Sequence, residues 1–189
     1  MNDCEIIQKS LDWCQGTPEL PGIKRRVYFI SKRAIVKWPT LPVDANGRPS
    51  AAAYTGNFTL AEGAKWKYID HLPSKAQVQT ETQGEVPSQT FKVSVTIVHP
   101  ATGEEASAAG CYLLNDDNVF LVEDMKGNIR VVGSDYYDAT ATISQDLGQG
   151  ATGTAGTTIK LEATDIVSLP VYKGQIVTDD GIINEGAGA

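Results

Sequence analysis

The segment FLVEDMKGNIRVVG, from Phe120 to Gly133, contains two apolar runs separated by Asp124-Met125-Lys126-Gly127. Two apolar runs joined by a short polar link that contains glycine predict a β-hairpin. The segment contains no nucleophile, no histidine and no cysteine. The clearest structural signal in the chain is therefore a piece of sheet that carries no chemistry of its own.

Similar runs on both sides of this hairpin extend the sheet. In TFKVSVTIVH (Thr90–His99), alternate residues are apolar, which is the pattern of a strand with one face on a core. Successive strands follow one another without an intervening helix, so the sequence predicts an all-β fold, an antiparallel β-sandwich or barrel. The other strands are expected at 25–30, 33–38, two within 57–72, 75–84, 110–114 (GCYLL), 119–123, 128–133, 139–147, 157–166 and 168–177.

One short helix is expected at the N-terminus. Cys4, Ile7, Leu11 and Cys14 recur at the spacing of one helical face. The sequence accordingly predicts an N-terminal helix and arm over residues 1–22. A β domain should follow over 23–178, and a flexible C-terminal tail over 179–189.

Charge is unevenly distributed along the 189 residues. The net charge is −7, with 11 basic against 7 acidic residues in 1–75 and 5 against 16 in 76–189. An acidic chain is a poor ligand for nucleic-acid phosphates. The basic cluster Lys24–Arg26, with Lys32 and Arg33, either touches DNA or contacts an acidic neighbour. The sequence contains no apolar run near the ~18 residues of a membrane span, and MNDCEIIQKS lacks the features of a secretion signal. We therefore expect a protein made in the cytoplasm, without membrane insertion.

The sequence does not support a catalytic, cofactor or metal site. His71 and His99 each lie at a strand end, without a partner at metal-ligand spacing. Cys111 falls in the expected apolar strand GCYLL and is interpreted as buried and inert. The paired carboxylates, such as those of NDDN and TDDG, lie in predicted turns and lack the spacing of a calcium loop. The glycine-rich loop Gly148–Gly156 joins two strands, which excludes a dinucleotide site.

Three segments carry a resemblance to a known family. PGIKRRVYFISKRAIVKWPTLP, NVFLVEDMKGNIRVVG and VSLPVYKGQI resemble segments of small virion proteins of tailed phages from gut bacteria, and the whole chain resembles a tail tube protein. The resemblance implies a β-sandwich or barrel with a flanking helix, in hexameric rings that stack head to tail around a channel for DNA. It implies no catalytic residue. A helix at the N-terminus departs from this family, which commonly places one within the connections of the sheet.

The hypothesis is thus a non-enzymatic virion structural protein, located in the phage tail. Its partners would be copies of itself, other virion tail proteins, and DNA that passes an acidic channel without specific binding. The long connection Pro39–Gly56, the loop Gly148–Gly156 and both termini would become ordered against neighbouring subunits, and edge strands would pair between subunits. The candidate subunit-contact residues are Trp38, Asn46, Gly47, Arg48, Gly148, Gly150, Thr154 and Gly156.

Two other classes of function remain open. A monomeric β-sandwich could bind glycans through exposed tryptophans, with Trp66 and Tyr68 on one face. A small hydrolase could use carboxylates from turns, although no pair stands out. Another virion part, such as a head–tail connector or a baseplate protein, is also compatible with the resemblance.

Overall fold

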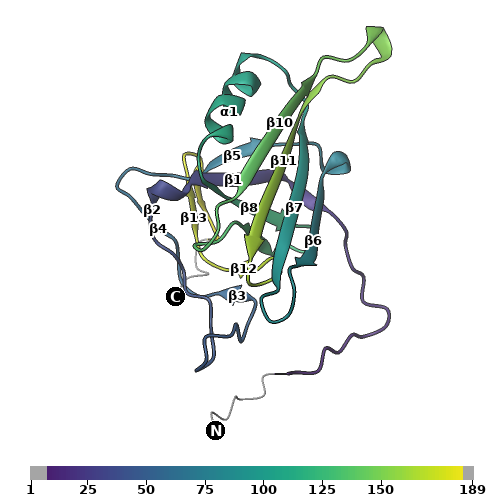
Figure 1. Ribbon diagram of the computed structural model, residues 1–189. Helices are drawn as coiled ribbons and strands as arrows, with labels where there is room; N and C mark the ends of the chain where they lie inside the picture. Colours follow the sequence, from purple (N-terminus) through teal and green to yellow (C-terminus); the bar gives the residue numbers. More distant parts are fainter. Residues whose placement is uncertain (1–7, 185–189) are drawn as a thin grey trace.

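The computed structural model describes residues 8–184, which form one helix and fourteen strands (Figure 1). The helix is α1 (Glu104–Leu114). The strands are β1 (Ile23–Ser31), β2 (Ile35–Lys37), β3 (Ala53–Tyr54), β4 (Thr59–Leu60), β5 (Lys67–Asp70), β6 (Gln77–Gln83), β7 (Thr90–His99), β8 (Asn118–Asp124), β9 (Ile129–Val132), β10 (Thr140–Asp146), β11 (Gly156–Asp165), β12 (Val171–Tyr172), β13 (Ile176–Thr178) and β14 (Gly181–Ile183).

The strands form two main sheets. The larger has the order β3-β12-β9-β8-β1-β5, and the smaller has the order β10-β11-β7-β6. All pairs in them are antiparallel except the short pair of β3 with β12. The predicted all-β, sandwich-like fold is confirmed.

The first core lies between the two sheets. The alternating residues of β7 point into it: Val93, Val95 and Ile97 are at most 1% exposed. From the larger sheet, Val27, Phe120 and Val122 meet them. Leu113 of α1 closes one side of this core. Burial of alternate residues is what the pattern of the sequence indicated for β7.

A second core covers the other face of the larger sheet. Tyr28, Leu121 and Val131 belong to it, so β1, β8 and β9 are buried on both faces. This explains why these strands are continuous apolar runs rather than alternating ones. The cover comes from the small sheets β2-β4 and β13-β14 and from aromatic side chains, among which Phe58 and Tyr172 have ring centres 5.0 Å apart.

The β8–β9 hairpin has the predicted position. Val122 pairs with Arg130 and Phe120 with Val132. The turn is closed by Gly127, whose N–H donates to the Asp124 carbonyl oxygen at 3.0 Å and whose φ is +90°. A positive φ of this size favours glycine, which is why the link ends in that residue.

The prediction of an N-terminal helix is wrong for the residues that the structure describes. Residues 8–22 form no helix and every one of them is exposed, while residues 1–7 lie outside the described part. Within the described part, Leu11 and Cys14 of the expected helical face pack on no surface, and a short helix without packing is not stable in water.

The helix occurs instead at Glu104–Leu114, where GCYLL was predicted to be a strand. Its buried residues Ala106, Gly110 and Leu113 are spaced as one helical face. Cys111 is consequently exposed on α1, and its interpretation as a buried strand residue is wrong.

The C-terminal boundary also differs from the expectation. Within the predicted flexible tail, Gly181–Ile183 forms β14 and pairs with β13. The expected strand 168–177 is divided into β12 and β13, which belong to different sheets. Residues 185–189 lie outside the described part. No helix found in residues 8–184 has both the length and the apolar character to cross a membrane.

Candidate assembly surfaces

The candidate contact residues form two groups at opposite ends of the molecule. The connection between β2 and β3 lies at the lower end in Figure 1, and the tip of the β10–β11 hairpin projects at the upper right. The structure therefore does not bring the two groups together within one subunit. Two separate surfaces on one molecule are the arrangement that head-to-tail contacts between copies require.

The connection from Pro39 to Gly56 is folded on itself. Thr40 and Thr55 form a β-bridge at its base. At its tip, the Asp44 carboxylate accepts hydrogen bonds from the backbone N–H groups of Asn46 and Arg48, both at 2.9 Å, and from Arg48 Nε at 2.6 Å. These hydrogen bonds, first that from the Arg48 backbone, hold the pKa of Asp44 below its usual value. The connection thus takes its shape from internal contacts, which differs from the sequence-based prediction that it becomes ordered against neighbouring subunits.

The four candidates in or next to this connection are accessible to different degrees. Asn46 and Gly47 are exposed at its tip, and Arg48 is half-buried. Trp38 packs edge-on against Phe58, with ring centres 5.2 Å apart, and so joins the second core. Its role as a contact residue is limited to the part of the residue that stays exposed.

The β10–β11 hairpin extends past the body of the sandwich (Figure 1). Its last pair is Asp146 with Gly156, and a short 3-10 turn, Gly150–Thr152, forms the tip. The backbone is tightly folded there, because a Cβ atom at Gly153 would lie 2.2 Å from Gln149 N. Thr154 and Gly150 are exposed at the tip, and Gly156 is buried where the hairpin joins the sheet.

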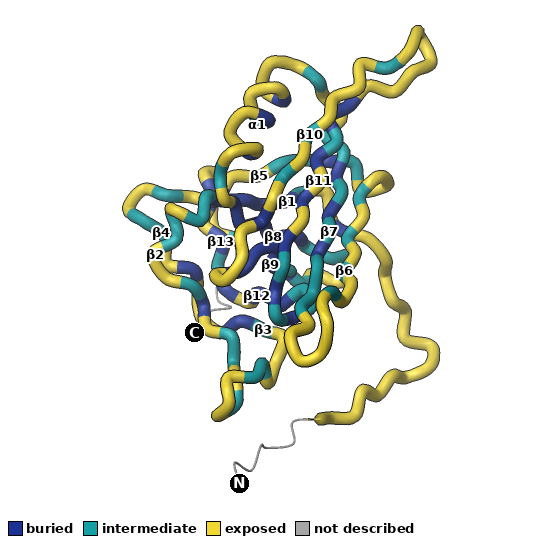
Figure 2. The backbone as a smooth tube through the Cα atoms, viewed as in Figure 1, coloured by how far each residue is buried: buried dark blue, intermediate teal, exposed yellow. Residues whose placement is uncertain are grey.

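The N-terminal arm, residues 8–22, is the third projecting segment (Figure 2). It carries three large exposed apolar side chains: Leu11 is 100% exposed, Trp13 65% and Leu20 55%. Nothing in the described part of the same molecule covers them. Apolar side chains held in water on an extended segment are typical of a segment that is covered by a partner.

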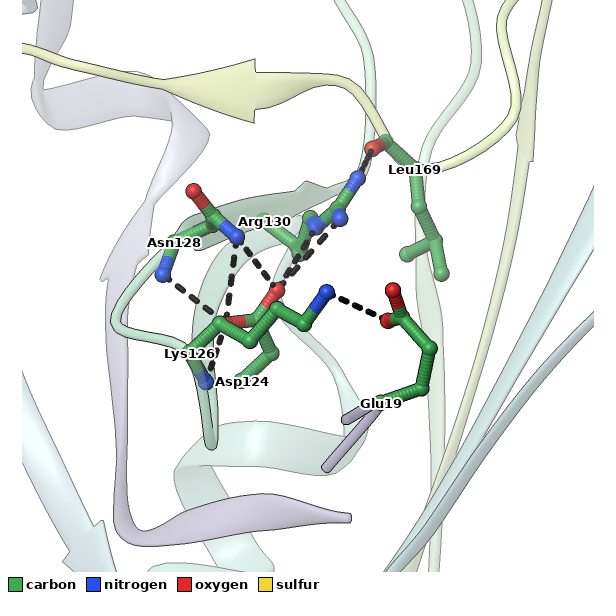
Figure 3. A network of polar contacts seen from close by, with 6 residues as sticks. All are labelled: Glu19, Asp124, Lys126, Asn128, Arg130 and Leu169. Carbon is green, nitrogen blue, oxygen red and sulfur yellow. Dashed lines mark hydrogen bonds and ion pairs between the residues drawn. The ribbon is translucent and has the colours of Figure 1, made fainter. Parts of the chain in front are cut away.

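The arm is attached to the body beside the β8–β9 turn. Glu19 forms an ion pair with Lys126 of that turn (Figure 3). Below it, Asp124 accepts hydrogen bonds from the backbone N–H groups of Lys126 (3.0 Å) and Asn128 (2.8 Å), and Arg130 Nε lies 3.3 Å from Asp124 Oδ2. Burial raises the pKa of Asp124, but the Asn128 hydrogen bonds and the Arg130 charge outweigh it, so the pKa is lower than usual.

A groove between β5 and α1 was not predicted from the sequence. It consists of two hollows of about 210 and 440 Å³ that share Tyr68 and Tyr112. The smaller one is also lined by Ile69, Ala106 and Ala109, and the larger one by Phe29 and Trp66. Because α1 was mistaken for a strand, its contribution of Tyr112 to this groove could not be foreseen.

Charged groups surround the groove. The Arg26 guanidinium lies 3.7 Å from the centre of the Tyr68 ring and donates from Nε to Asp70 at 2.9 Å. A hydrogen bond with Asp180 raises the pKa of the Tyr68 hydroxyl. Lys67 forms an ion pair with Asp179 at the rim. Tyr68 is thereby held in a fixed position on the edge of the sheet.

Most of the basic cluster is paired within the chain. Lys24 pairs with Glu123, Arg26 with Asp70, Lys32 with Asp138 and Arg33 with Asp116. An acidic neighbour was one of the two expectations for this cluster, and for these four residues the neighbour is in the same molecule. Such neutralised cations are poor anchors for phosphates.

The side chains considered for catalysis form no hydrogen bond with one another in the described part of the chain. His71 is buried, and burial lowers its pKa. His99 uses Nδ1 for a 2.7 Å hydrogen bond with the Asp70 carbonyl oxygen. Cys111 Sγ lies 3.7 Å from the carbonyl oxygen of Ser107, within its own helix. Residues 8–184 contain no group of three histidine, cysteine, aspartate or glutamate side chains that could hold a metal ion.

Trp66 does not form an exposed platform. It is 1% exposed and packs edge-on against Phe58 at 5.4 Å in the second core. Tyr68, two residues later, is 38% exposed but is held by Arg26. A glycan site built on an exposed Trp66 is therefore incompatible with the structure.

Comparison with known proteins gave no relative. No known protein family, no curated protein and no solved structure matches the chain.

Proposed function

We propose that the chain is a non-enzymatic virion structural protein that assembles with copies of itself into stacked, hexameric rings of a phage tail tube. The observation that carries this proposal is the contrast between body and projections. The body buries both faces of its larger sheet, whereas the N-terminal arm leaves Leu11 and Trp13 in water and the hairpin tip leaves Leu147 78% exposed. Exposed apolar side chains on projections become stable when another molecule covers them.

The position of the helix supports the same proposal. α1 lies in the connection between β7 and β8, two strands that belong to different sheets. The helix flanks the sandwich (Figure 1). This is where the resemblance to tail tube proteins implies a helix. The departure that the sequence suggested, a helix at the N-terminus, is not found in residues 8–22.

Charge is compatible with passage of DNA through such a tube. The net charge is −7, and Lys24, Arg26, Lys32 and Arg33 are paired within the chain, so this basic cluster offers little free positive charge to phosphates. A wall of like charge repels DNA and allows it to slide without adhering. The partners of the subunit would be its own copies and other proteins of the tail.

Sedimentation velocity of the purified full-length chain tests the proposal. We expect the monomer to give way to a discrete ring species and then to larger stacks as protein concentration rises. A ring that never stacks would favour a connector or baseplate role instead. A monomer at every concentration, in buffers of low and high salt, would contradict self-assembly.

A further inference from the structure

The outer edge of β5 presents unpaired backbone groups. The His71 N–H donates to the carbonyl oxygen of Arg25 in the neighbouring strand β1. Because backbone groups alternate in direction along a strand, Trp66, Tyr68 and Asp70 direct theirs away from β1.

The two ends of this edge already have partners. The Trp66 N–H donates to the Val177 carbonyl oxygen at 2.9 Å, and the Asp70 carbonyl oxygen accepts from His99 Nδ1 at 2.7 Å. Between these ends, the N–H and the carbonyl oxygen of Tyr68 form no hydrogen bond within the described part of the chain. An open edge of this kind is a template for an added strand.

Two hollows lined by both apolar and charged residues lie beside this open position. The two hollows of the groove meet at Tyr68 and Tyr112, and Tyr112 is 55% exposed on α1. Added strands bind through their backbone and gain specificity from pockets that take alternate side chains. The groove therefore fits an extended segment with two apolar residues at positions i and i+2.

The N-terminal arm contains such a segment. Leu11 and Trp13 are separated by one residue, so in an extended strand they point to the same side, about 7 Å apart. Residues Gln8–Cys14 precede the turn in which the Thr17 N–H donates to the Cys14 carbonyl oxygen. Both prolines of the arm, Pro18 and Pro21, come after that turn, so every residue of Gln8–Cys14 can donate to a ladder.

The arm is directed away from the β5 edge of its own molecule. In the sheet, β8 lies on one side of β1 and β5 on the other. The arm is attached on the β8 side, through the Glu19–Lys126 ion pair and the approach of Gly22 to Met125. The β5 edge of a second copy is consequently easier for this segment to reach than the β5 edge of its own molecule.

We propose that Gln8–Cys14 of one copy adds as a strand to the outer edge of β5 in a second copy, with Leu11 and Trp13 seated in the two hollows beside Tyr112. This inference rests on the proposed self-assembly and names the surface through which two copies join. The added strand satisfies the backbone of Tyr68 and covers the side chains that the arm leaves in water.

Crosslinking between copies tests this contact. Cys14 is exposed next to Trp13. In a full-length Cys4→Ser, Cys111→Ser background, Lys67→Cys places a second thiol on β5. A short bismaleimide should then yield covalent dimers and longer ladders on a denaturing gel. The matched control replaces Lys67→Cys by Val86→Cys, at an 80% exposed position in the β6–β7 connection, and should yield none.

A second measurement separates this inference from the proposed function. Leu11→Ser with Trp13→Ser should raise the concentration of half-assembly about a hundredfold, because these would be the central apolar contacts of an interface. Leu20→Ser, in the same arm but beyond the turn, should change it less than about threefold. Unchanged assembly of the double variant, without crosslinking through Lys67→Cys, would overturn the inference and leave the tube proposal standing. A wild-type chain that never assembles would overturn both.

Discussion

Asp124 and Arg130 form an ion pair across the β8–β9 hairpin, with Arg130 Nη2 3.3 Å from Asp124 Oδ2. Arg130 Nη1 also donates to the Leu169 carbonyl oxygen at 3.2 Å (Figure 3). Leu169 lies just before β12 and has a φ of +45°, a value that L-residues rarely adopt. The pair therefore connects the hairpin turn to the backbone at Leu169, whose conformation is unfavourable for an L-residue.

Asp124→Ala should lower the free energy of unfolding by about 2–3 kcal/mol, because it leaves several donors of one turn without their acceptor. Glu123→Ala is the matched control: it removes only the partly exposed Lys24–Glu123 pair, and should cost less than about 1 kcal/mol. Urea denaturation of both variants measures the difference. Equal effects of the two substitutions would show that the network does not stabilise the turn.

The same carboxylate gives a pH dependence with a defined sign. Its pKa is lowered in the folded chain, so its contribution is present above the unfolded pKa of about 3.9 and is lost as pH falls through the folded value. The excess stability of wild type over Asp124→Ala should therefore shrink on acidification below about pH 4.

Asp165 should show the opposite behaviour. It is 3% exposed, and burial raises its pKa to about 6, although backbone N–H groups of Ile166 and Val167 lower it. The folded protein then holds this proton more tightly than the unfolded chain does, so wild type loses stability as pH rises from about 4 to 6. Relative to Asp165→Asn, that loss should reach about 3 kcal/mol above pH 6. A stability difference that stays constant between pH 3.5 and 7, in urea titrations, would contradict a buried ionising carboxyl.

Trp66→Ala should destabilise the fold by about 3–5 kcal/mol, because the indole is fully buried against Phe58 in the second core. Trp13→Ala, on the exposed arm, should leave the unfolding free energy of the monomer within about 0.5 kcal/mol of wild type. Thermal unfolding of the two variants at a concentration below assembly makes this comparison. A Trp66→Ala chain as stable as wild type would contradict the role of the buried indole in the second core.

Gly153→Ala should affect assembly more than folding. Its Cβ would lie 2.2 Å from Gln149 N, so the tip of the β10–β11 hairpin must open. Since the tip is exposed and distant from both cores, monomer stability should change by less than about 1 kcal/mol. Under the proposed function, the concentration of half-assembly should rise about tenfold.

The exposed neighbour Ala151→Ser is the matched control for the tip and should leave assembly unchanged. Sedimentation velocity compares the two variants. If Gly153→Ala assembles like wild type, the hairpin tip is not a subunit contact.

The local pattern of apolar and polar residues was sufficient to predict most strands of the two main sheets. The alternation in β7, β10 and β11 and the apolar runs of β8 and β9 place these strands where the structure has them. Pattern failed for α1, because Tyr112 and Leu113 in GCYLL suit a strand, while the helical face of Ala106, Gly110 and Leu113 includes two small residues that give a weak apolar signal. At the N-terminal arm the spacing of apolar residues predicted a helix, but residues 8–22 form none, because they have no surface to pack on.

The candidate assembly surfaces could be predicted only in part. Composition identified Gly148–Gly156 as a flexible loop and Pro39–Gly56 as a long connection, both expected to become ordered against neighbouring subunits. The internal hydrogen bonds of Asp44, which fold that connection, depend on three-dimensional geometry that composition does not report. The groove between β5 and α1 required both the helix and the strand order, so no local sequence signal for it exists.

Negative-stain electron microscopy of the purified full-length chain at high concentration tests the central claim, self-assembly into a tube, most directly. We predict rings viewed along their axis and stacks of such rings viewed from the side. Fields that contain only isolated, compact single molecules would contradict it.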